Sequence, residues 1–225
     1  MGDVLVADRL LVGYAGRPVC GEASFGISSG KVLAMVGFNG AGKSTVARTL
    51  AGRQAALAGE VRLLGLPVLP DSVAFRRQVA VVFDEDVFFP SLTVREHLLL
   101  VARGHALDAP EDAVDAELDF FGLSERSDVV PDMLSSGQRR RLLLAAAFIR
   151  PSVLLVLDEP EQRLDPVMRD ALAHRVRRRS DAGTAVVLVT HDPRLLVQTA
   201  TTCLVIDEVV EQVDTALGAQ FIAGS

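Results

Sequence analysis

The sequence predicts an α/β fold with a mostly parallel sheet, a small antiparallel β region and an inserted helical subdomain. Short apolar runs, which are typical of buried strands, alternate with helical segments in residues 1–83 and again after residue 150. Between these parts, residues 94–149 carry helical patterns only. We therefore expect a single domain, with an α/β core at 1–83 and 150–225 and a helical subdomain at 84–149.

The first part of the core contains apolar runs that are short enough for strands. The run at 32–36 is wholly apolar, as expected for a strand that is buried on both faces of a parallel sheet. The segment at 44–50 follows a glycine-rich loop and is expected to be helical. In order, we expect strands at 4–7, 9–12 and 32–36, the helix at 44–50, and strands at 60–64 and 79–83.

Prolines divide the helical middle of the chain. Pro110 and Pro131 lie between periodic segments, and proline interrupts helices because it lacks an N–H group. We expect helices there at 94–103, 111–121 and 137–149. Strands then return at 153–157, 185–189 and 203–206, with helices at 166–179 and 193–199 between them. Residues 214–225 carry signals too weak for a structural prediction.

Composition excludes several classes of protein. The chain has 225 residues, a net charge of −6 and a pI near 5.2, which argues against a surface built to bind nucleic acid. No apolar run reaches the roughly 18 residues that a membrane helix needs. The N-terminus lacks a signal pattern, so we expect a cytoplasmic protein. Cys20 and Cys203 have no metal-ligand spacing and are expected to be buried, reduced thiols.

The most informative motif is a glycine-rich loop between the strand at 32–36 and the helix at 44–50. It reads Gly-Phe-Asn-Gly-Ala-Gly-Lys-Ser, which fits the phosphate-binding loop of a P-loop NTPase core. Glycines let backbone N–H groups surround phosphate oxygens, and the helix N-terminus adds a favourable dipole. The expected nucleotide-binding residues are Gly37, Asn39, Gly40, Ala41, Gly42, Lys43, Ser44 and Thr45.

Two residues of this loop have specific expected roles. The ammonium of Lys43 would bind the terminal phosphates, and we expect it to be exposed when the site is empty. The hydroxyl of Ser44 suits Mg²⁺, which prefers oxygen ligands. A glycine-rich turn that happens to contain Lys-Ser is the structural alternative, and the flanking strand and helix argue against it.

A second candidate site is the acidic end of the strand at 153–157. Asp158 can hold Mg²⁺ or its water beside the phosphates, and Glu159 can act as a general base toward the attacking water. A strand that ends in two solvated acids would show the same pattern. The pattern gains meaning only together with the phosphate loop.

A third motif, Leu-Ser-Ser-Gly-Gln at 134–138, lies about twenty residues before the acidic strand end and opens a predicted helix. Together with the two motifs above, it strongly resembles the ATP-binding subunit of ABC (ATP-binding cassette) transporters, whose signature is Leu-Ser-Gly-Gly-Gln. An isolated match would be an ordinary helix N-cap. The resemblance implies ATP contacts at Ser135, Ser136, Gly137 and Gln138.

Further resemblances extend along the chain. Tyr14, the only tyrosine, occupies the place of the family's adenine-stacking aromatic, although a core aromatic at a strand end is the alternative. His191 resembles the family's switch histidine, which would contact the γ-phosphate and help to orient Glu159 and water. Leu164 and Asp165 resemble the end of the loop that crosses to the partner subunit.

The sequence departs from the family pattern in two places. Asp84 follows Val82-Phe83 where the family usually has glutamine, and it could offer an oxygen to Mg²⁺ or to the attacking water. The alternative for residues 84–86 is a solvated acidic turn. Residues 161–163 read Glu-Gln-Arg where the family more often has small residues, so coupling between subunits is expected to differ in detail.

The resemblance implies an ATPase with ATP and Mg²⁺ as cofactors. It also implies a second ATPase subunit, identical or paralogous, packed head to tail so that each ATP lies between the phosphate loop of one chain and the signature of the other. A separate transmembrane permease subunit would dock near residues 84–93, which places the chain on the cytoplasmic face of the membrane. Neither the substrate nor the direction of transport follows from the sequence.

Two other functions agree less well with the sequence than a transporter ATPase does. A non-transport ABC ATPase acting on DNA, ribosomes or another complex usually brings coiled coils, a second cassette or a basic surface, none of which is evident. A P-loop kinase or GTPase does not explain the signature segment or His191. The arginine-rich run at 175–179 could favour an anionic partner, but a solvated helix end explains it better in an acidic chain.

Overall fold

The structure is a computed structural model that describes residues 2–224. Its strands are β1 (Asp3–Leu11), β2 (Gly13–Tyr14), β3 (Arg17–Pro18), β4 (Ala23–Ser28), β5 (Val32–Val36), β6 (Ala58–Leu63), β7 (Leu66–Pro67), β8 (Val79–Val82), β9 (Leu154–Asp158), β10 (Ala185–Val189), β11 (Thr202–Val205) and β12 (Glu211–Val213). Its helices are α1 (Lys43–Leu50), α2 (Val73–Gln78), α3 (Val94–Gly104), α4 (Pro110–Phe120), α5 (Ser136–Phe148), α6 (Pro166–Asp181), α7 (Pro193–Thr199) and α8 (Thr215–Ala223). Two short 3₁₀ turns, Ser124–Arg126 and Pro131–Met133, precede α5.

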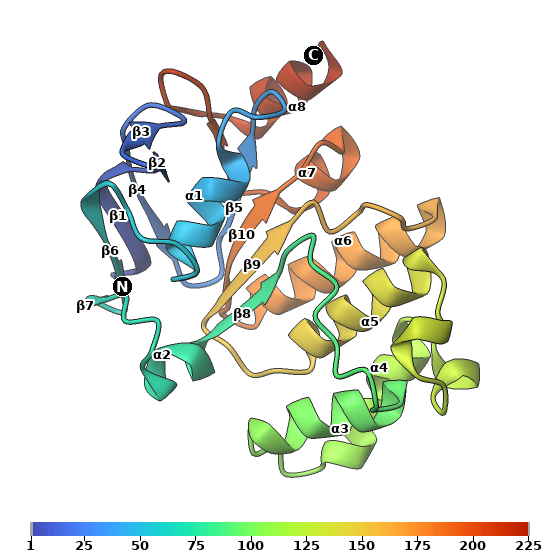
Figure 1. The fold of residues 1–225 in the computed structure, drawn as a ribbon. Coiled ribbons are helices and arrows are strands. Elements are labelled where there is room, and N and C mark those ends of the chain that lie inside the picture. The colour runs from blue at the N-terminus through green and yellow to red at the C-terminus, as the bar shows by residue number, and fades with distance from the viewer. Residues whose placement is uncertain (1, 225) are drawn as a thin grey trace.

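A six-stranded sheet forms the centre of the molecule, in the order β12-β11-β5-β10-β9-β8 (Figure 1). Its strands are parallel except for β12, which pairs antiparallel with β11 at one edge. A four-stranded antiparallel sheet, in the order β4-β1-β6-β7, lies beside it. The predicted α/β fold, with its mostly parallel sheet and small antiparallel region, is confirmed.

The register of the central strands brings three loops together. Val189 of β10 pairs with Asp158 of β9 on one side and with Met35 of β5 on the other. Every residue of β5, β9 and β10 is buried, which explains why these segments are apolar runs rather than alternating patterns. Because parallel strands end at the same edge, the loops that follow β5, β9 and β10 meet there.

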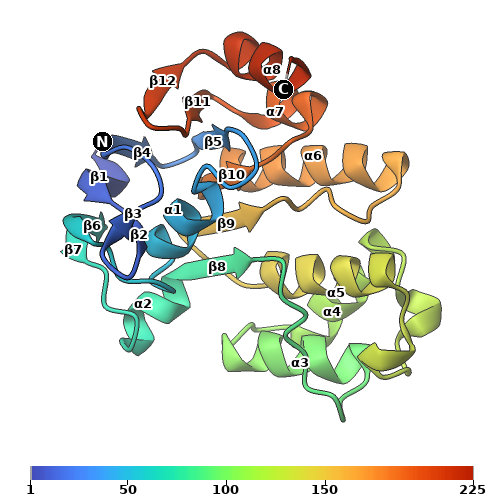
Figure 2. The ribbon, with the colours of Figure 1, turned by 45° about the horizontal axis from the view of Figure 1, so that its top comes forward.

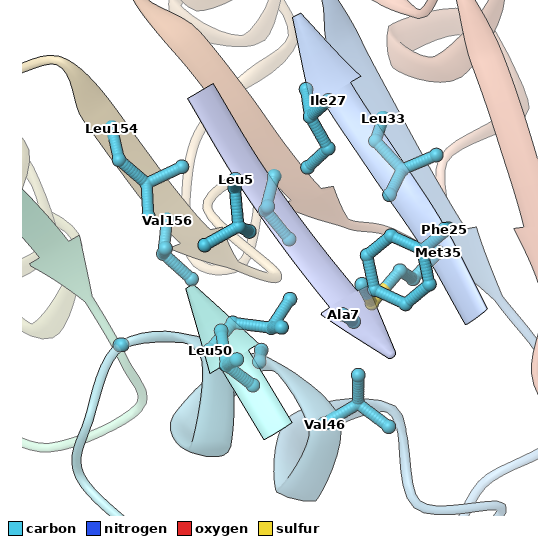
Figure 3. Packing of buried hydrophobic residues seen from close by; sticks show 14 of the residues in the cluster. Leu5, Ala7, Phe25, Ile27, Leu33, Met35, Val46, Leu50, Leu154 and Val156 are labelled. Atoms are coloured by element: carbon cyan, nitrogen blue, oxygen red, sulfur yellow. The ribbon is translucent and has the colours of Figure 1, made fainter. Parts of the chain in front are cut away.

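Helix α1 lies between the two sheets and anchors the loop that precedes it. Val46 and Leu50 of α1 pack with Leu5 of β1, Met35 of β5 and Val156 of β9 in one buried cluster (Figure 3). Burial of a large aliphatic side chain stabilises the fold by about 1.5–3 kcal/mol. The N-terminus of α1 is thereby held at the edge where the loops meet.

Helices α3, α4 and α5 are inserted between β8 and β9 and lie on the far side of β8 from the antiparallel sheet (Figure 2). A second buried cluster joins this helical region to the sheet, from Leu98 and Phe121 to Leu142, Leu157 and Leu188. The division into a core and a helical subdomain at 84–149 stays a prediction. No helix within residues 2–224 is long and apolar enough to cross a membrane.

Most expected elements are present, but one pair of expected strands needs correction and several elements were not predicted. The strands β5 and β10 and the helix α7 have the expected bounds. The expected strands at 4–7 and 9–12 are one strand, β1, whose pairing shifts register near Arg9, a residue with φ 46°. The sequence predicted no counterpart of β2, β3, β4, β7, β12, α2 or α8. Helix α8 packs on α7 and β11, contacts that no local pattern reveals.

The arginine run at 175–179 is only partly the solvated helix end that the sequence predicted. Arg175 pairs with the buried Glu117, and its guanidinium lies 4.8 Å from the ring centroid of Phe120. Arg177 donates to the carbonyl of Gln198 at 2.8 Å, and Arg179 donates to Ser152 Oγ at 3.1 Å. These side chains tie α6 to its neighbours. The expectation of a solvated surface was wrong for Arg175 and Arg179, which are partly buried, whereas Arg177 and Arg178 are exposed as expected.

Candidate functional site

The phosphate loop runs from the end of β5 to the start of α1, as predicted. Gly37 has φ 155°, and a Cβ there would lie 2.4 Å from the carbonyl oxygen of Ile206. Gly42 has φ 96°, and a Cβ there would lie 2.8 Å from Val19 Cγ2. Both positions therefore require glycine for space and for backbone conformation. Of the remaining predicted residues, Asn39, Gly40 and Ala41 lie in this loop, and Lys43, Ser44 and Thr45 form the first turn of α1.

Lys43 lies inside the loop rather than in solvent. Its Nζ donates to the carbonyl oxygens of Gly37 and Phe38, both at 2.9 Å, and only 4% of the residue is exposed. The expectation that Lys43 is exposed in the empty site was wrong, because the loop carbonyls supply its hydrogen-bond acceptors. Burial lowers the pKa of Lys43, and the charges of Glu159 and Asp158 oppose that shift.

Ser44 and Asp158 meet beside the loop. Ser44 Oγ donates to Asp158 Oδ1 at 3.2 Å, so two hard oxygen ligands from α1 and β9 lie together. Burial raises the pKa of Asp158, and the hydrogen bond from Ser44 opposes this. The donor set fits Mg²⁺, which binds through few protein oxygens and keeps several waters.

Glu159 follows β9 with a left-handed backbone, φ 47°, and its N–H donates to the carbonyl of Val189 at 2.9 Å. Glu159 Oε1 lies 3.5 Å from His191 Nε2, and Glu159 Oε2 accepts a hydrogen bond from the side-chain amide of Gln162. Burial and the positive charge of Lys43 lower the pKa of His191 against the pull of Glu159, so the imidazole is neutral at pH 7.

The two predicted catalytic residues are thus neighbours. Glu159 and His191 line a cavity of about 770 Å³ together with Asn39 of the phosphate loop. A carboxylate near a neutral imidazole, with a lysine and two oxygen ligands close by, can bind a phosphate chain and accept a proton from a water. The sequence predicted all of these residues, and β5, β9 and β10 bring them to one edge.

The signature segment opens α5 through a capping box. Ser135 Oγ accepts from Gln138 N at 3.2 Å, and Gln138 Oε1 accepts from Ser135 N at 3.0 Å. Ser135 and Ser136 are exposed, and a Cβ on Gly137 would lie 2.8 Å from the carbonyl oxygen of Arg163. The start of α5 and the phosphate-loop end of α1 lie apart in both Figure 1 and Figure 2, so one chain does not join them.

Arg140 is a site residue that sequence reasoning missed. It is 1% exposed, and its guanidinium donates to the carbonyls of Phe83, Asp158 and Glu159 at 2.8, 2.7 and 2.7 Å. Burial lowers its pKa. Arg140 thereby connects α5 to the ends of β8 and β9. The only signal in the sequence was its place within the arginine run that follows the signature.

Tyr14 lies in β2 near the first turn of α1. Its hydroxyl is 3.3 Å from Thr45 Oγ1, and 58% of the residue is exposed. The hydrogen bond holds the ring beside the phosphate loop, and the exposed ring can stack on a base. The alternative of a buried core aromatic is wrong; adenine stacking stays a prediction.

Asp84 forms an ion pair with Arg163 at 2.9 Å, which joins the two places where the sequence departs from the family pattern. Asp86 lies 3.9 Å from the same guanidinium, and Glu85 pairs with Arg48 at 2.7 Å. The acidic turn is therefore held by arginines and is not simply solvated. Metal or water contact by Asp84 stays a prediction.

Comparison with curated proteins gives relatives in bacteria. Nod factor export ATP-binding protein I of Rhizobium etli is 37% identical over 180 residues, which covers 79% of this chain and 57% of the relative. The protein of the same name from Neorhizobium galegae is also 37% identical, over 79% of this chain and 52% of the relative. The chain thus spans little more than half of the length of these relatives.

Solved structures share the fold over nearly the whole chain. One described as the ATP-binding subunit of an ABC transporter has a TM-score of 0.86 and 25% identity, covering 99% of this chain and 95% of its own. CbiO1 from Clostridium perfringens, described as part of the ABC transporter complex CbiONQ, has a TM-score of 0.80 over 99% of this chain and 93% of its own. At 23% identity, that second likeness shows the fold alone.

A family model described as ABC transporter matches residues 20–162. This match covers more than half of the chain and includes the phosphate loop, the signature segment and the acidic end of β9. The chain therefore belongs to the ABC transporter family.

Proposed function

We propose that this chain is an ATP-hydrolysing subunit that energises transport through a separate transmembrane subunit. The observation that carries the proposal is the meeting of Lys43, Ser44, Asp158, Glu159 and His191 at one edge of the sheet. Lys43 would hold the terminal phosphates, and Glu159 would take a proton from the water that attacks the γ-phosphorus. Mg²⁺, held by Ser44 and Asp158, would neutralise phosphate charge.

The remaining site residues complete the proposal. His191 would contact the γ-phosphate and orient the water, and Tyr14 would stack on adenine. Ser135, Ser136, Gly137 and Gln138 would bind the γ-phosphate of ATP held by a second copy or paralogue. The exposure of Ser135 and Ser136 at the start of α5, away from the chain's own phosphate loop, supports a shared site.

The docking surface that we propose for the transmembrane subunit is a groove between β8, α3 and α5. It has a volume of about 710 Å³, and the exposed apolar side chains of Val87, Phe89 and Leu100 line it. A helix of the membrane subunit fits such a groove. This partner would hold the chain on the cytoplasmic face of the membrane. Both relatives are named export proteins, which supports export as the direction of transport.

Purification of the tagged chain from membranes tests the transporter against a non-transport ABC ATPase. We expect a polytopic membrane protein to co-purify, and we expect its presence to change the rate of ATP hydrolysis. Recovery of the chain with ribosomes or DNA instead would favour the non-transport alternative.

Mixing two inactive variants tests the shared site. Lys43→Ala breaks the phosphate loop, and Ser135→Arg blocks the signature. In a mixed head-to-tail dimer both defects fall in one site, so the other site is intact. At equal mixing, half of the dimers are mixed and half of their sites are intact, so about a quarter of wild-type ATPase activity should return.

Association must be measured in the same mixture, because activity would not return if both sites must fire together. ATP-dependent binding of one variant to the other then reports the shared site. Absence of both recovery and mixed association would favour a monomeric P-loop enzyme.

The metal contact that we propose for Asp84 predicts a shift in Mg²⁺ dependence. Asp84→Asn should raise the Mg²⁺ concentration for half-maximal ATPase activity by up to about tenfold, the scale for groups that contact metal-bound water. Arg163→Ala frees the carboxylate and should lower that concentration. Glu111→Gln breaks an exposed pair with Arg103 and is the control. Identical Mg²⁺ curves for all of these proteins would leave Asp84 with an ion-pairing role only.

A further inference from the structure

Glu161 is a buried acid in the turn after β9, and the proposed reaction does not yet use it. Only 5% of the residue is exposed, although it lies two residues from Glu159 and lines the same cavity. Burial raises the pKa of its carboxyl group, and hydrogen bonds oppose that shift. A small side chain at this position would avoid the cost of burying an acid.

One oxygen of Glu161 organises the loop that follows β10. Its Oε1 accepts from the hydroxyl of Thr190 at 2.6 Å and from the backbone N–H of His191 at 3.0 Å. The hydroxyl oxygen of Thr190 in turn accepts from the N–H of Asp192 at 2.9 Å. A single carboxylate oxygen therefore restrains three consecutive residues, with His191 in the middle.

The same turn also contacts the proposed base. Gln162, the next residue, donates from its side-chain amide to Glu159 Oε2. Glu161 thus holds the backbone of His191 while Gln162 holds the carboxylate of Glu159. His191 Nε2 and Glu159 Oε1, the two groups that these side chains restrain, lie 3.5 Å apart.

We propose that Glu161 is a positioning residue for ATP hydrolysis, which sets the place of His191 relative to Glu159 and the γ-phosphate. The inference rests on the proposed function, since it gives His191 and Glu159 their roles in hydrolysis. Glu161 acts through hydrogen-bond acceptance by Oε1 and not through proton transfer. A glutamine can supply the same acceptor, whereas alanine cannot.

Steady-state kinetics of two variants test this role. Glu161→Ala should lower kcat by roughly 10- to 100-fold, the scale for displacing a catalytic group by about 1 Å. KM for ATP should change by less than about threefold, because the phosphate loop and Tyr14 are untouched. Glu161→Gln should keep kcat within about threefold of wild type. A glutamine variant as slow as the alanine variant would overturn the acceptor role.

A double-mutant cycle with His191→Ala separates positioning from general damage. If Glu161 acts through His191, the Glu161→Ala, His191→Ala double variant should be as active as His191→Ala alone. Fully multiplicative losses would overturn the proposal. Thr190→Val removes the hydroxyl that donates to Glu161 Oε1 and should also lower kcat, by a smaller factor than Glu161→Ala. This variant tests the same role if Glu161→Ala does not fold.

Histidine NMR gives a readout that is independent of activity. The chain has four histidines, and Glu161→Ala should move the imidazole resonance of His191 while His97, His105 and His174 keep theirs. Glu117→Ala is the matched control, because it removes another buried acid, 4% exposed, far along the chain in α4. It should lower stability without changing the resonance of His191. An unmoved His191 resonance in Glu161→Ala would overturn the proposal.

The outcomes distinguish this inference from the proposed function. If wild type does not hydrolyse ATP, the proposed function fails, and the NMR result still reports whether Glu161 positions His191. If wild type hydrolyses ATP and Glu161→Ala keeps wild-type kcat, the function stands and the inference fails.

Discussion

Replacing Glu159 with glutamine should slow ATP hydrolysis by roughly 10²–10⁴ while ATP stays bound, as expected for loss of a positioned general base. The amide has the shape of the carboxylate but cannot accept the proton of the attacking water. The left-handed backbone at Glu159 and its N–H bond to Val189 do not depend on the side chain, so the loop should keep its shape. Single-turnover hydrolysis and retention of radiolabelled ATP measure the two effects separately.

The slow variant should also accumulate an ATP-bound dimer, because hydrolysis is the step that reopens it in the proposed cycle. Size-exclusion chromatography with Mg²⁺ and ATP measures this state. Glu117→Gln, a change of the same type in a buried acid of α4, is the control and should turn over normally. Near-normal turnover in Glu159→Gln would place the base elsewhere, with His191 as the next candidate.

Much of the geometry of the candidate site could be predicted from the sequence because its main parts are local. Gly37 and Gly42 need glycine for reasons of backbone conformation, and their spacing within one loop is visible in the sequence. The strands β5, β9 and β10 are buried throughout, so each is a continuous apolar run. Parallel pairing of such strands then brings the residues after Asp158 and Val189 together.

The missed features depend on contacts between distant segments. Glu161 is a loop residue in the sequence, and only the pairing of β9 with β10 places it against Thr190 and His191. In the sequence, Arg140 looks like any charged residue of a helix. Only the fold brings the three carbonyls to which it donates into contact with it. A local pattern describes the residues near a position in the chain and does not encode such partners.

The burial of Lys43 shows that a sequence pattern does not reveal all contacts even within the phosphate-loop motif. The sequence predicted a cation for phosphate, but it did not predict that the carbonyls of Gly37 and Phe38 accept hydrogen bonds from the ammonium. The motif therefore predicts which groups are present, and the folded loop decides which of them interact before the ligand binds.

Lys43→Met should abolish the stabilisation of the chain by ATP while the empty protein stays folded. Methionine keeps most of the aliphatic stem but removes the ammonium. Each hydrogen bond that the ammonium loses lowers the free energy of unfolding by at most about 1.5–3 kcal/mol. Removing a buried charge offsets part of this loss. Burial lowers the pKa of Lys43, and the charges of Glu159 and Asp158 oppose that shift. The net change in unfolding free energy should therefore be small.

Thermal unfolding with and without ATP separates binding from folding for this variant. At a ligand concentration of 100 times Kd, wild type should gain about 2.7 kcal/mol of stability, because ATP binds only the folded chain. Lys43→Met should gain almost none at the same concentration, since the phosphates lose the cation that the loop holds for them. Lys31→Met, which replaces the other lysine and lies outside the loop, should keep the wild-type gain. A folded Lys43→Met protein with that full gain would contradict the assignment of the phosphate loop.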